Sequence, residues 1–137
     1  MLLVYIVLLS CVKFSLTINN EIAEDFYSFV VKDIRGEDVP LEKFRGKVSL
    51  VVNVASECGY TDSHYKALKR LHDILSFHGK FNVLAFPCNQ FGEQEPLEND
   101  QIEEFAVNEY GVEFPLFGKI NVIGENSHPA FKYLVGG

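Results

Sequence analysis

The feature that most limits the fold of this chain is a pair of apolar runs separated by one amphipathic segment. Residues 48–55 form a nearly continuous apolar run, broken only by Ser49 and Asn53, which is typical of a strand buried on both faces of a parallel sheet. Residues 81–86 form a second such run. Between them apolar residues recur at helical spacing, and Gly79 is placed to end a helix. Strand, helix and strand in this order predict a right-handed crossover between two parallel strands.

The helix between the two runs is expected to begin at Thr61 or Asp62, because either side chain can accept a hydrogen bond from a free amide of the first turn. The residues that recur at helical spacing on its apolar face are Tyr65, Leu68, Leu71, His72 and Leu75. His72 is expected to be a packed histidine, since the histidines and cysteines show no zinc-type spacing.

Shorter elements are expected on either side of this unit. They are a strand, its hairpin partner, a second helix, an extended segment and a short helix, at residues 26–32, 39–41, 100–110, 114–120 and 129–134. A turn at Arg35 and Gly36 joins the hairpin, and Gly111 ends the second helix. No repeat, low-complexity tract or linker interrupts the pattern, so we expect one domain.

The charge of the chain limits its partners. The formal net charge is −7, and no basic stripe offsets the acidic residues, which argues against binding to nucleic acid or to anionic membranes. We therefore expect a small-molecule partner. The acidic residues after the second apolar run are expected to be solvated rather than a general acid pair, and they are Glu93, Glu95, Glu98 and Asp100.

The beginning of the chain differs from the rest. Its apolar run, Leu2 to Leu9, is too short to span a bilayer, which needs about 20 apolar residues, and lies too close to the start to be a buried strand of the domain. We expect residues 1–17 to be a secretory signal peptide and residues 18–137 to be the domain. The alternatives are a retained membrane anchor or a core segment. Cleavage would remove Cys11.

Two cysteines then remain, Cys58 and Cys88. Cys58 lies where the first apolar strand gives way to a helix start, and the amides and dipole of a helix N-terminus favour the reactive thiolate. Cys58 is therefore a candidate nucleophile, with a buried inert cysteine as the alternative. A permanent disulfide between the two cysteines is a further reading, although the core is large enough not to need one.

The segments Ser56–Gly59 and Pro87–Gln90 follow the two predicted strands. Ligands of parallel sheets gather beyond the carboxyl ends of the strands, so Cys58 and the amide of Gln90 are expected to reach one pocket. A thiolate that attacks a peroxide needs hydrogen-bond donors for the departing oxygen anion. Gln90 could supply one, with an exposed loop amide as the alternative reading. The product would be a sulfenic acid that a second thiol reduces.

These residues lie in segments that resemble a known family, the glutathione peroxidases. The resembling segments are residues 53–59, 84–96 and 113–120. The resemblance extends from about Phe26 to Leu134 and implies a thioredoxin-like α/β fold that reduces hydrogen peroxide or organic hydroperoxides with a thiol donor. It makes Cys58 the peroxidatic residue, at the place of selenocysteine in the best-known members, and Gln90 the catalytic glutamine.

The resemblance also implies the partners. It implies no bound cofactor or metal, and a thiol reductant such as glutathione or a thioredoxin-like protein as co-substrate. It is strongest to secretory-pathway members that work with protein disulfide isomerases, so secretion and the endoplasmic reticulum lumen are both expected. Contact with a membrane is expected only if the N-terminal segment is retained.

Two features depart from the family pattern. Members that use thioredoxin carry a resolving cysteine where this chain has Val107, so Cys88 is the remaining internal candidate, with apolar packing as its alternative role. The family's Trp-Asn-Phe stretch is absent, and the chain has no tryptophan. We therefore expect a thioredoxin-like fold that lacks the C-terminal strands and last helix, as a fragment, a splice form or a short paralogue of impaired activity. An uncovered sheet edge and apolar face would invite a partner or aggregation.

The sequence thus favours a thiol-dependent peroxidase that responds to oxidative stress. One alternative is a thiol–disulfide exchange factor for oxidative folding that uses Cys58 and Cys88. Another is a truncated, non-catalytic binding protein.

Overall fold

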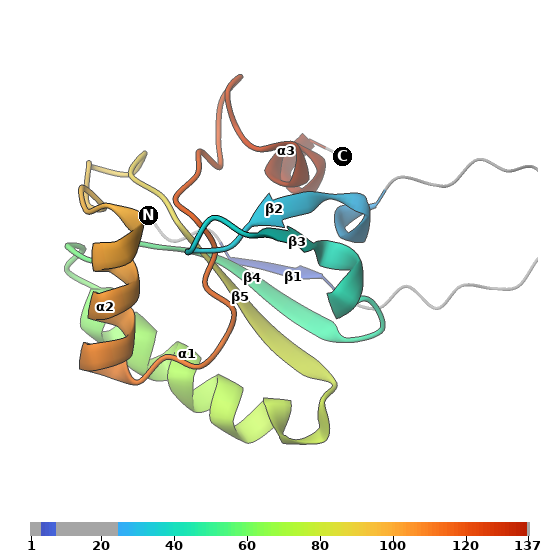
Figure 1. The fold of residues 1–137 in the computed structure, drawn as a ribbon, viewed down its shortest axis with the longest axis horizontal. Helices are drawn as coiled ribbons and strands as arrows, with labels where there is room; N and C mark the ends of the chain where they lie inside the picture. Colours follow the sequence, from blue (N-terminus) through green and yellow to red (C-terminus); the bar gives the residue numbers. More distant parts are fainter. Residues whose placement is uncertain (1–3, 8–24, 137) are drawn as a thin grey trace, which may run out of the picture.

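The computed structural model describes residues 4–7 and 25–136, in which helices cover both faces of a small central sheet (Figure 1). Three strands form this sheet in the order β1-β4-β5. β4 (Val48–Val54) and β5 (Phe81–Pro87) are parallel, and α1 (Thr61–Leu75) connects them. The predicted crossover is confirmed. Val54 lies opposite Pro87, so the carboxyl ends of both strands meet at one edge of the sheet.

The third strand was not expected from the sequence. β1 (Val4–Val7) pairs antiparallel with β4, with Val4 opposite Val52. It satisfies backbone groups on the edge of β4 that would otherwise be unpaired. Four residues of the predicted signal peptide therefore pair with the sheet, a run in which the sequence led us to expect no buried strand of the domain. The rest of residues 1–17, including Cys11, lies outside the described residues.

Two apolar clusters pack on opposite faces of the sheet, and successive residues of β5 alternate between them. Val83 belongs to the cluster under α1 and α2 (Asn99–Tyr110), and Leu84 belongs to the other. This alternation explains why both strands read as continuous apolar runs. The second face is covered by η1 (Phe26–Ser28), β2 (Val30–Lys32), β3 (Asp38–Pro40), η2 (Leu41–Phe44) and α3 (Pro129–Gly136).

The start of α1 differs from the prediction. Neither Thr61 nor Asp62 caps the helix; Tyr60 occupies the N-cap position and makes no side-chain capping bond. The Thr61 hydroxyl instead donates to the carbonyl of Ala55 at 2.7 Å, and the Asp62 carboxylate pairs with Lys66. The Thr61 side chain therefore closes the turn between β4 and α1.

The apolar face of α1 is covered along only part of its length. Tyr65 and Leu68 are buried, whereas Leu71 and Leu75 are 39% and 45% exposed. His72 packs its ring edge-on against Phe114, as expected of a packed histidine. The prediction of burial is thus wrong for Leu71 and Leu75, because α2 reaches only the first half of α1 (Figure 1).

The end of α1 follows the prediction in part. The helix continues into a short 3-10 turn, η3 (Ser76–His78), and Gly79 then adopts a left-handed conformation with φ 68°. Phe77 in this turn is 84% exposed. The chain therefore displays an apolar patch at this end of α1.

The remaining elements largely match the sequence. The expected first strand divides into η1 and the shorter β2, and Val31 of β2 lies opposite Val39 of β3 in the predicted hairpin. α2 ends at Gly111 with φ 62°. Residues 114–120 run extended beside β5, where Phe117 donates to the carbonyl of Ala85 at 2.9 Å. Among the described residues, no helix combines the length and apolar character needed to cross a membrane.

Candidate functional site

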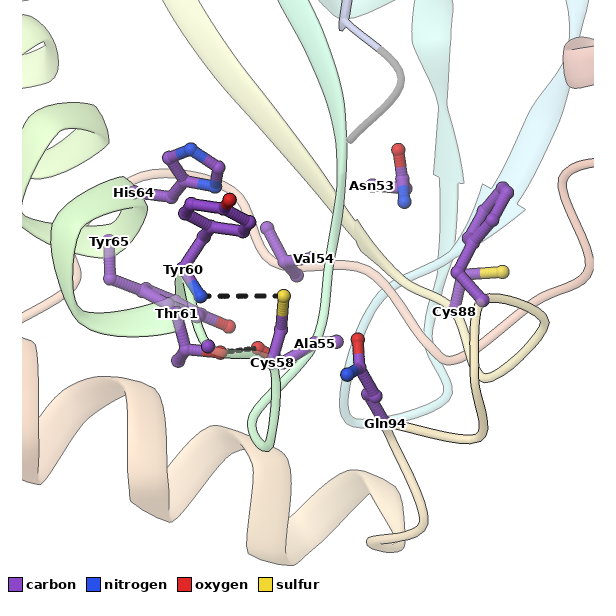
Figure 2. A pocket seen from close by; sticks show the side chains of 12 residues that line it. Asn53, Val54, Ala55, Cys58, Tyr60, Thr61, His64, Tyr65, Cys88 and Gln94 are labelled. Atoms are coloured by element: carbon purple, nitrogen blue, oxygen red, sulfur yellow. Dashed lines mark hydrogen bonds between the residues drawn. The ribbon is translucent and has the colours of Figure 1, made fainter. Parts of the chain in front are cut away.

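A cavity of about 430 Å³ opens beyond the carboxyl end of β4 (Figure 2). Its walls come from the end of β4, the turn before α1, the first turns of α1 and the segment that follows β5. The residues in its lining that carry polar or reactive groups include Asn53, Cys58, Tyr60, His64, Cys88 and Gln94. The expectation of a pocket beyond these strand ends is therefore met.

Cys58 lies in the turn that leads into α1. It is half-buried, and its carbonyl accepts a hydrogen bond from the amide of Thr61 at 3.0 Å. The amide of Tyr60 points at the Cys58 sulfur, 3.5 Å away (Figure 2). Amides and the dipole at a helix start stabilise negative charge. The Cys58 sulfur thus faces the cavity next to a backbone amide donor.

One side of the cavity mouth is aromatic. The ring of Tyr60 stacks on the imidazole of His64, with 5.6 Å between the ring centroids. Tyr60 is also mostly exposed. This stacked pair forms an apolar wall next to Cys58 (Figure 2), against which the organic part of a small molecule could rest.

Gln90 is not among the residues that line the cavity. Its side-chain oxygen accepts hydrogen bonds from the amides of Val122 at 2.7 Å and Ile123 at 3.1 Å. Its amide nitrogen donates to the carbonyl of Ile123 at 2.9 Å. The structure therefore does not bring the Gln90 amide to Cys58. The Gln90 amide instead bonds to the backbone of Val122 and Ile123, in the segment before α3.

Cys88 lines the same cavity as Cys58, and both are free thiols. Its side chain is buried, and its sulfur points away from Cys58 (Figure 2). The Cys88 thiol donates to the side-chain oxygen of Gln90 at 3.5 Å. Burial raises the pKa of the Cys88 thiol, which disfavours the nucleophilic form. In this arrangement Cys88 behaves as a packed residue, and no disulfide joins the two cysteines.

Two polar residues of the cavity were missed by the sequence reasoning. The amide of Gln94 points into the cavity, between Cys58 and Cys88 (Figure 2). The backbone carbonyl of Gln94 accepts a hydrogen bond from the amide of Glu57 at 2.9 Å. Asn53 is a buried polar residue in β4. The sequence signal for Asn53 was a polar residue inside an apolar run. The signal for Gln94 was its place in residues 84–96, the second segment of the family resemblance.

Glu95 was expected to be a solvated acid, and this expectation is wrong. Its side chain is 0% exposed, and one carboxylate oxygen accepts from the hydroxyl of Ser56 at 3.0 Å. Burial raises the pKa of Glu95 to about 7, although hydrogen bonds from Ser56 and the charge of Lys119 act to lower it. Glu95 therefore lies directly behind the turn that carries Cys58.

The described part of the chain contains no group of three or more histidine, cysteine, aspartate or glutamate residues arranged to hold a metal ion. The chemistry that these residues can support is that of a thiol next to amide donors, with an apolar wall on one side.

Comparisons with known proteins point to one family. Residues 26–135 match the family model described as glutathione peroxidase. The human protein named "Glutathione peroxidase 7" is 63% identical over 111 residues, which are 81% of this chain and 59% of that protein. The mouse protein named "Probable glutathione peroxidase 8" is 56% identical over 80% of this chain and 52% of its own length.

A solved structure shows the same fold. The crystal structure of Trgpx in apo form aligns with a TM-score of 0.63 and 38% sequence identity, over 82% of this chain and 64% of that one.

The chain spans only a little over half the length of the curated relatives it matches. On the family match and these identities, the chain belongs to the glutathione peroxidase family and has its thioredoxin-like fold.

Proposed function

We propose that this protein is a thiol-dependent peroxidase that reduces hydrogen peroxide or organic hydroperoxides at Cys58, in the response to oxidative stress. The observation that carries the proposal is the half-buried Cys58 sulfur, which faces a cavity of about 430 Å³ at the start of α1 with the Tyr60 amide 3.5 Å away. Family membership supports the same reaction class.

In the proposed reaction the Cys58 thiolate attacks one peroxide oxygen. A sulfur–oxygen bond forms, the oxygen–oxygen bond breaks, and the leaving oxygen takes up a proton to become water or an alcohol. Cys58 is then a sulfenic acid. Two equivalents of an external thiol return it to the thiol, with release of water and formation of one disulfide.

A hydrogen-bond donor must stabilise the leaving oxygen, and we propose Gln90 for this role. Donation by Gln90 requires that its bonds to Val122 and Ile123 open first. Gln94 is the competing amide, because it already points into the cavity. Comparing Gln90→Ala with Gln94→Ala separates the two, since only loss of the acting donor lowers the rate of peroxide reduction while Cys58 alkylation stays unchanged.

The proposed reductant is an external thiol, either glutathione or a thioredoxin-like or protein disulfide isomerase-like protein. Two observations support an external rather than an internal reductant. Cys88 is buried with its sulfur pointing away from Cys58, and burial raises the pKa of its thiol. A sulfenic acid on Cys58 would therefore persist until a second molecule reduces it.

A second candidate function is thiol–disulfide exchange through Cys58 and Cys88. One observation favours it, namely that both cysteines line the same cavity. A disulfide between them would require the Cys88 side chain to rotate towards Cys58, with loss of its hydrogen bond to Gln90.

The test uses the purified chain, the Cys58→Ser variant and Cys88→Ser as the matched control. We expect peroxide consumption with glutathione to require Cys58 and to survive the loss of Cys88. Intact mass after one equivalent of peroxide should show one added oxygen on Cys58, which a sulfenic-acid reagent traps. A loss of two hydrogens that needs both cysteines would establish the exchanger instead. A folded chain no faster than Cys58→Ser would leave only a binding role.

We propose the secretory pathway, either the endoplasmic reticulum lumen or the extracellular space, as the location. The apolar run at the start of the chain supports this proposal. Cleavage would remove β1 and leave the edge of β4 with which it pairs open. N-terminal sequencing of the protein isolated from cells tests it. A mature chain that begins near residue 18 is the expected result, and an intact Met1 on a cytosolic protein would contradict it.

A further inference from the structure

The proposed reaction leaves a buried carboxylate unused, that of Glu95. It is completely inaccessible to solvent, and one of its oxygens has no hydrogen-bond partner among the described residues. Within the same residues no cation pairs with it, because the ammonium of Lys119 donates instead to the backbone carbonyls of Glu95 at 3.3 Å and Leu97 at 2.7 Å. Burial of a carboxylate without an ionic partner is costly. A buried carboxylate at this position therefore indicates a role that an apolar residue could not fill.

The carboxylate acts on the turn that carries Cys58. One oxygen accepts from the Ser56 hydroxyl at 3.0 Å, and the neighbouring residue, Gln94, accepts from the amide of Glu57 at 2.9 Å. Ser56 and Glu57, just before Cys58, are thus hydrogen-bonded to Glu95 and Gln94 of the segment after β5.

That segment is itself fixed. The amide of Glu95 donates to the side-chain oxygen of Asn89 at 2.9 Å, and Asn89 lies just beyond the end of β5. On the other side, the Thr61 hydroxyl joins the carbonyl of Ala55 at 2.7 Å. The turn that carries Cys58 is therefore fixed at Ala55 by the Thr61 hydroxyl and at Ser56 by the Glu95 carboxylate.

We propose that Glu95 is a positioning residue that holds the Cys58 turn through Ser56, so that the Cys58 sulfur stays within reach of the Tyr60 amide. The inference rests on the proposed function, in which Cys58 is the reacting thiol. Without the link through Ser56, the turn would move more freely and the 3.5 Å contact between the Tyr60 amide and the sulfur would weaken.

The same carboxyl makes the turn sensitive to pH. The charged and titratable groups that act on it are Glu57 and Lys119, and Tyr65 from α1 senses its charge. Burial raises the pKa of Glu95 to about 7, so it gains a negative charge near neutral pH. Once ionised, the carboxylate accepts a stronger hydrogen bond from the Ser56 hydroxyl, which holds the turn that carries Cys58 more firmly.

The first test measures the rate at which iodoacetamide alkylates Cys58 in the full chain, read by peptide mass spectrometry at pH 7. Ser56→Ala and Glu95→Ala should each slow alkylation about fivefold, the effect of one lost hydrogen bond of about 1 kcal/mol. The alkylation rate of the double variant, Ser56→Ala with Glu95→Ala, should lie within about twofold of the slower single variant, because both changes remove the same hydrogen bond. Glu93→Gln, which removes the same charge from an exposed position of the same loop, should leave the rate unchanged.

Two results would overturn the positioning role. One is a folded Glu95→Ala protein that alkylates within twofold of the wild-type rate, and the other is a double variant in which the two effects multiply. If Glu95→Ala does not fold, Ser56→Ala decides alone, and an unchanged Cys58 rate in that variant rejects the inference.

The second test uses Glu95→Gln, which keeps an acceptor for Ser56 but cannot ionise. Its alkylation rate relative to wild type should be near one at pH 6 and fall below about one half at pH 8, where the wild-type carboxylate is ionised and holds Ser56 more strongly. If this ratio does not change with pH, ionisation of Glu95 has no effect on the turn that carries Cys58, and the proposed pH sensitivity is wrong. Alkylation needs no peroxide, so a chain that reduces no peroxide but passes both tests rejects the proposed function and not this inference.

Discussion

The buried carboxyl of Glu95 makes a quantitative prediction about stability. Its folded-state pKa is about 7, against an ordinary value of 4.5. Between these values the unfolded chain loses the proton while the folded chain keeps it. The free energy of unfolding therefore falls as pH rises from 4.5 to 7, and this loss is complete above pH 7.

The size of the effect follows from the interval between the two values. At about 1.36 kcal/mol for each pH unit, an interval of about 2.5 corresponds to an upper limit of about 3.4 kcal/mol. Glu95→Gln preserves the shape of the side chain and an acceptor for the Ser56 hydroxyl but removes the titration. The stability of the variant relative to wild type should therefore increase by about 2–3 kcal/mol between pH 4.5 and pH 8. Any constant cost of the new amide cancels in this difference.

Urea unfolding followed by far-ultraviolet circular dichroism at both pH values measures this quantity. Other groups that titrate in the same range, such as His128, are present in both proteins and cancel in the comparison. Glu93→Gln is the matched control, because Glu93 is exposed, and its relative stability should not change with pH. If the relative stability of Glu95→Gln varies by less than about 0.5 kcal/mol over this range, the carboxyl ionises normally and the reasoning from its burial fails.

Three further substitutions test other parts of the fold. Thr61→Val removes the part-buried hydrogen bond to the carbonyl of Ala55 and should lower the free energy of unfolding by about 1–2 kcal/mol in urea titrations, whereas Thr61→Ser should restore it. The neutral His128 ring accepts a hydrogen bond from the amide of Ala130 at 3.2 Å, and burial lowers the pKa of His128 below its ordinary 6.5. This stabilisation is present above pH 6.5 and lost as pH falls, so His128→Asn should lose less stability than wild type between pH 7 and pH 5; equal losses would contradict the assignment. Phe86 is fully buried, and Phe86→Ala should lower the free energy of unfolding by about 3–5 kcal/mol in the same titrations.

The elements that the sequence predicted well depend on local patterns. The two apolar runs specify β4 and β5, because a strand buried on both faces needs apolar residues at nearly every position. The end of α2 follows from Gly111, and the end of η3, which continues α1, follows from Gly79. Both glycines adopt left-handed conformations that other residues adopt only at a cost. Parallel pairing follows from the length of the connection between the strands.

The parts that could not be predicted depend on what lies across from each segment. The repeating pattern of α1 marks an apolar face, but only packing against α2 decides that Leu68 is buried and Leu71 is exposed. The pairing of β1 with β4 is likewise a contact between segments about forty residues apart in the sequence. No local pattern encodes such a contact.

The candidate site divides in the same way. The sequence by itself determined that a thiol at a helix start and two polar loops meet beyond the ends of two parallel strands, because strand order and spacing are encoded locally. Only the tertiary structure decided that Gln90 turns to the Val122 backbone, that Gln94 points into the cavity and that Glu95 lies buried behind Cys58. The physical reason is that the direction and burial of a loop side chain depend on hydrogen-bond partners and neighbours that other segments of the chain supply.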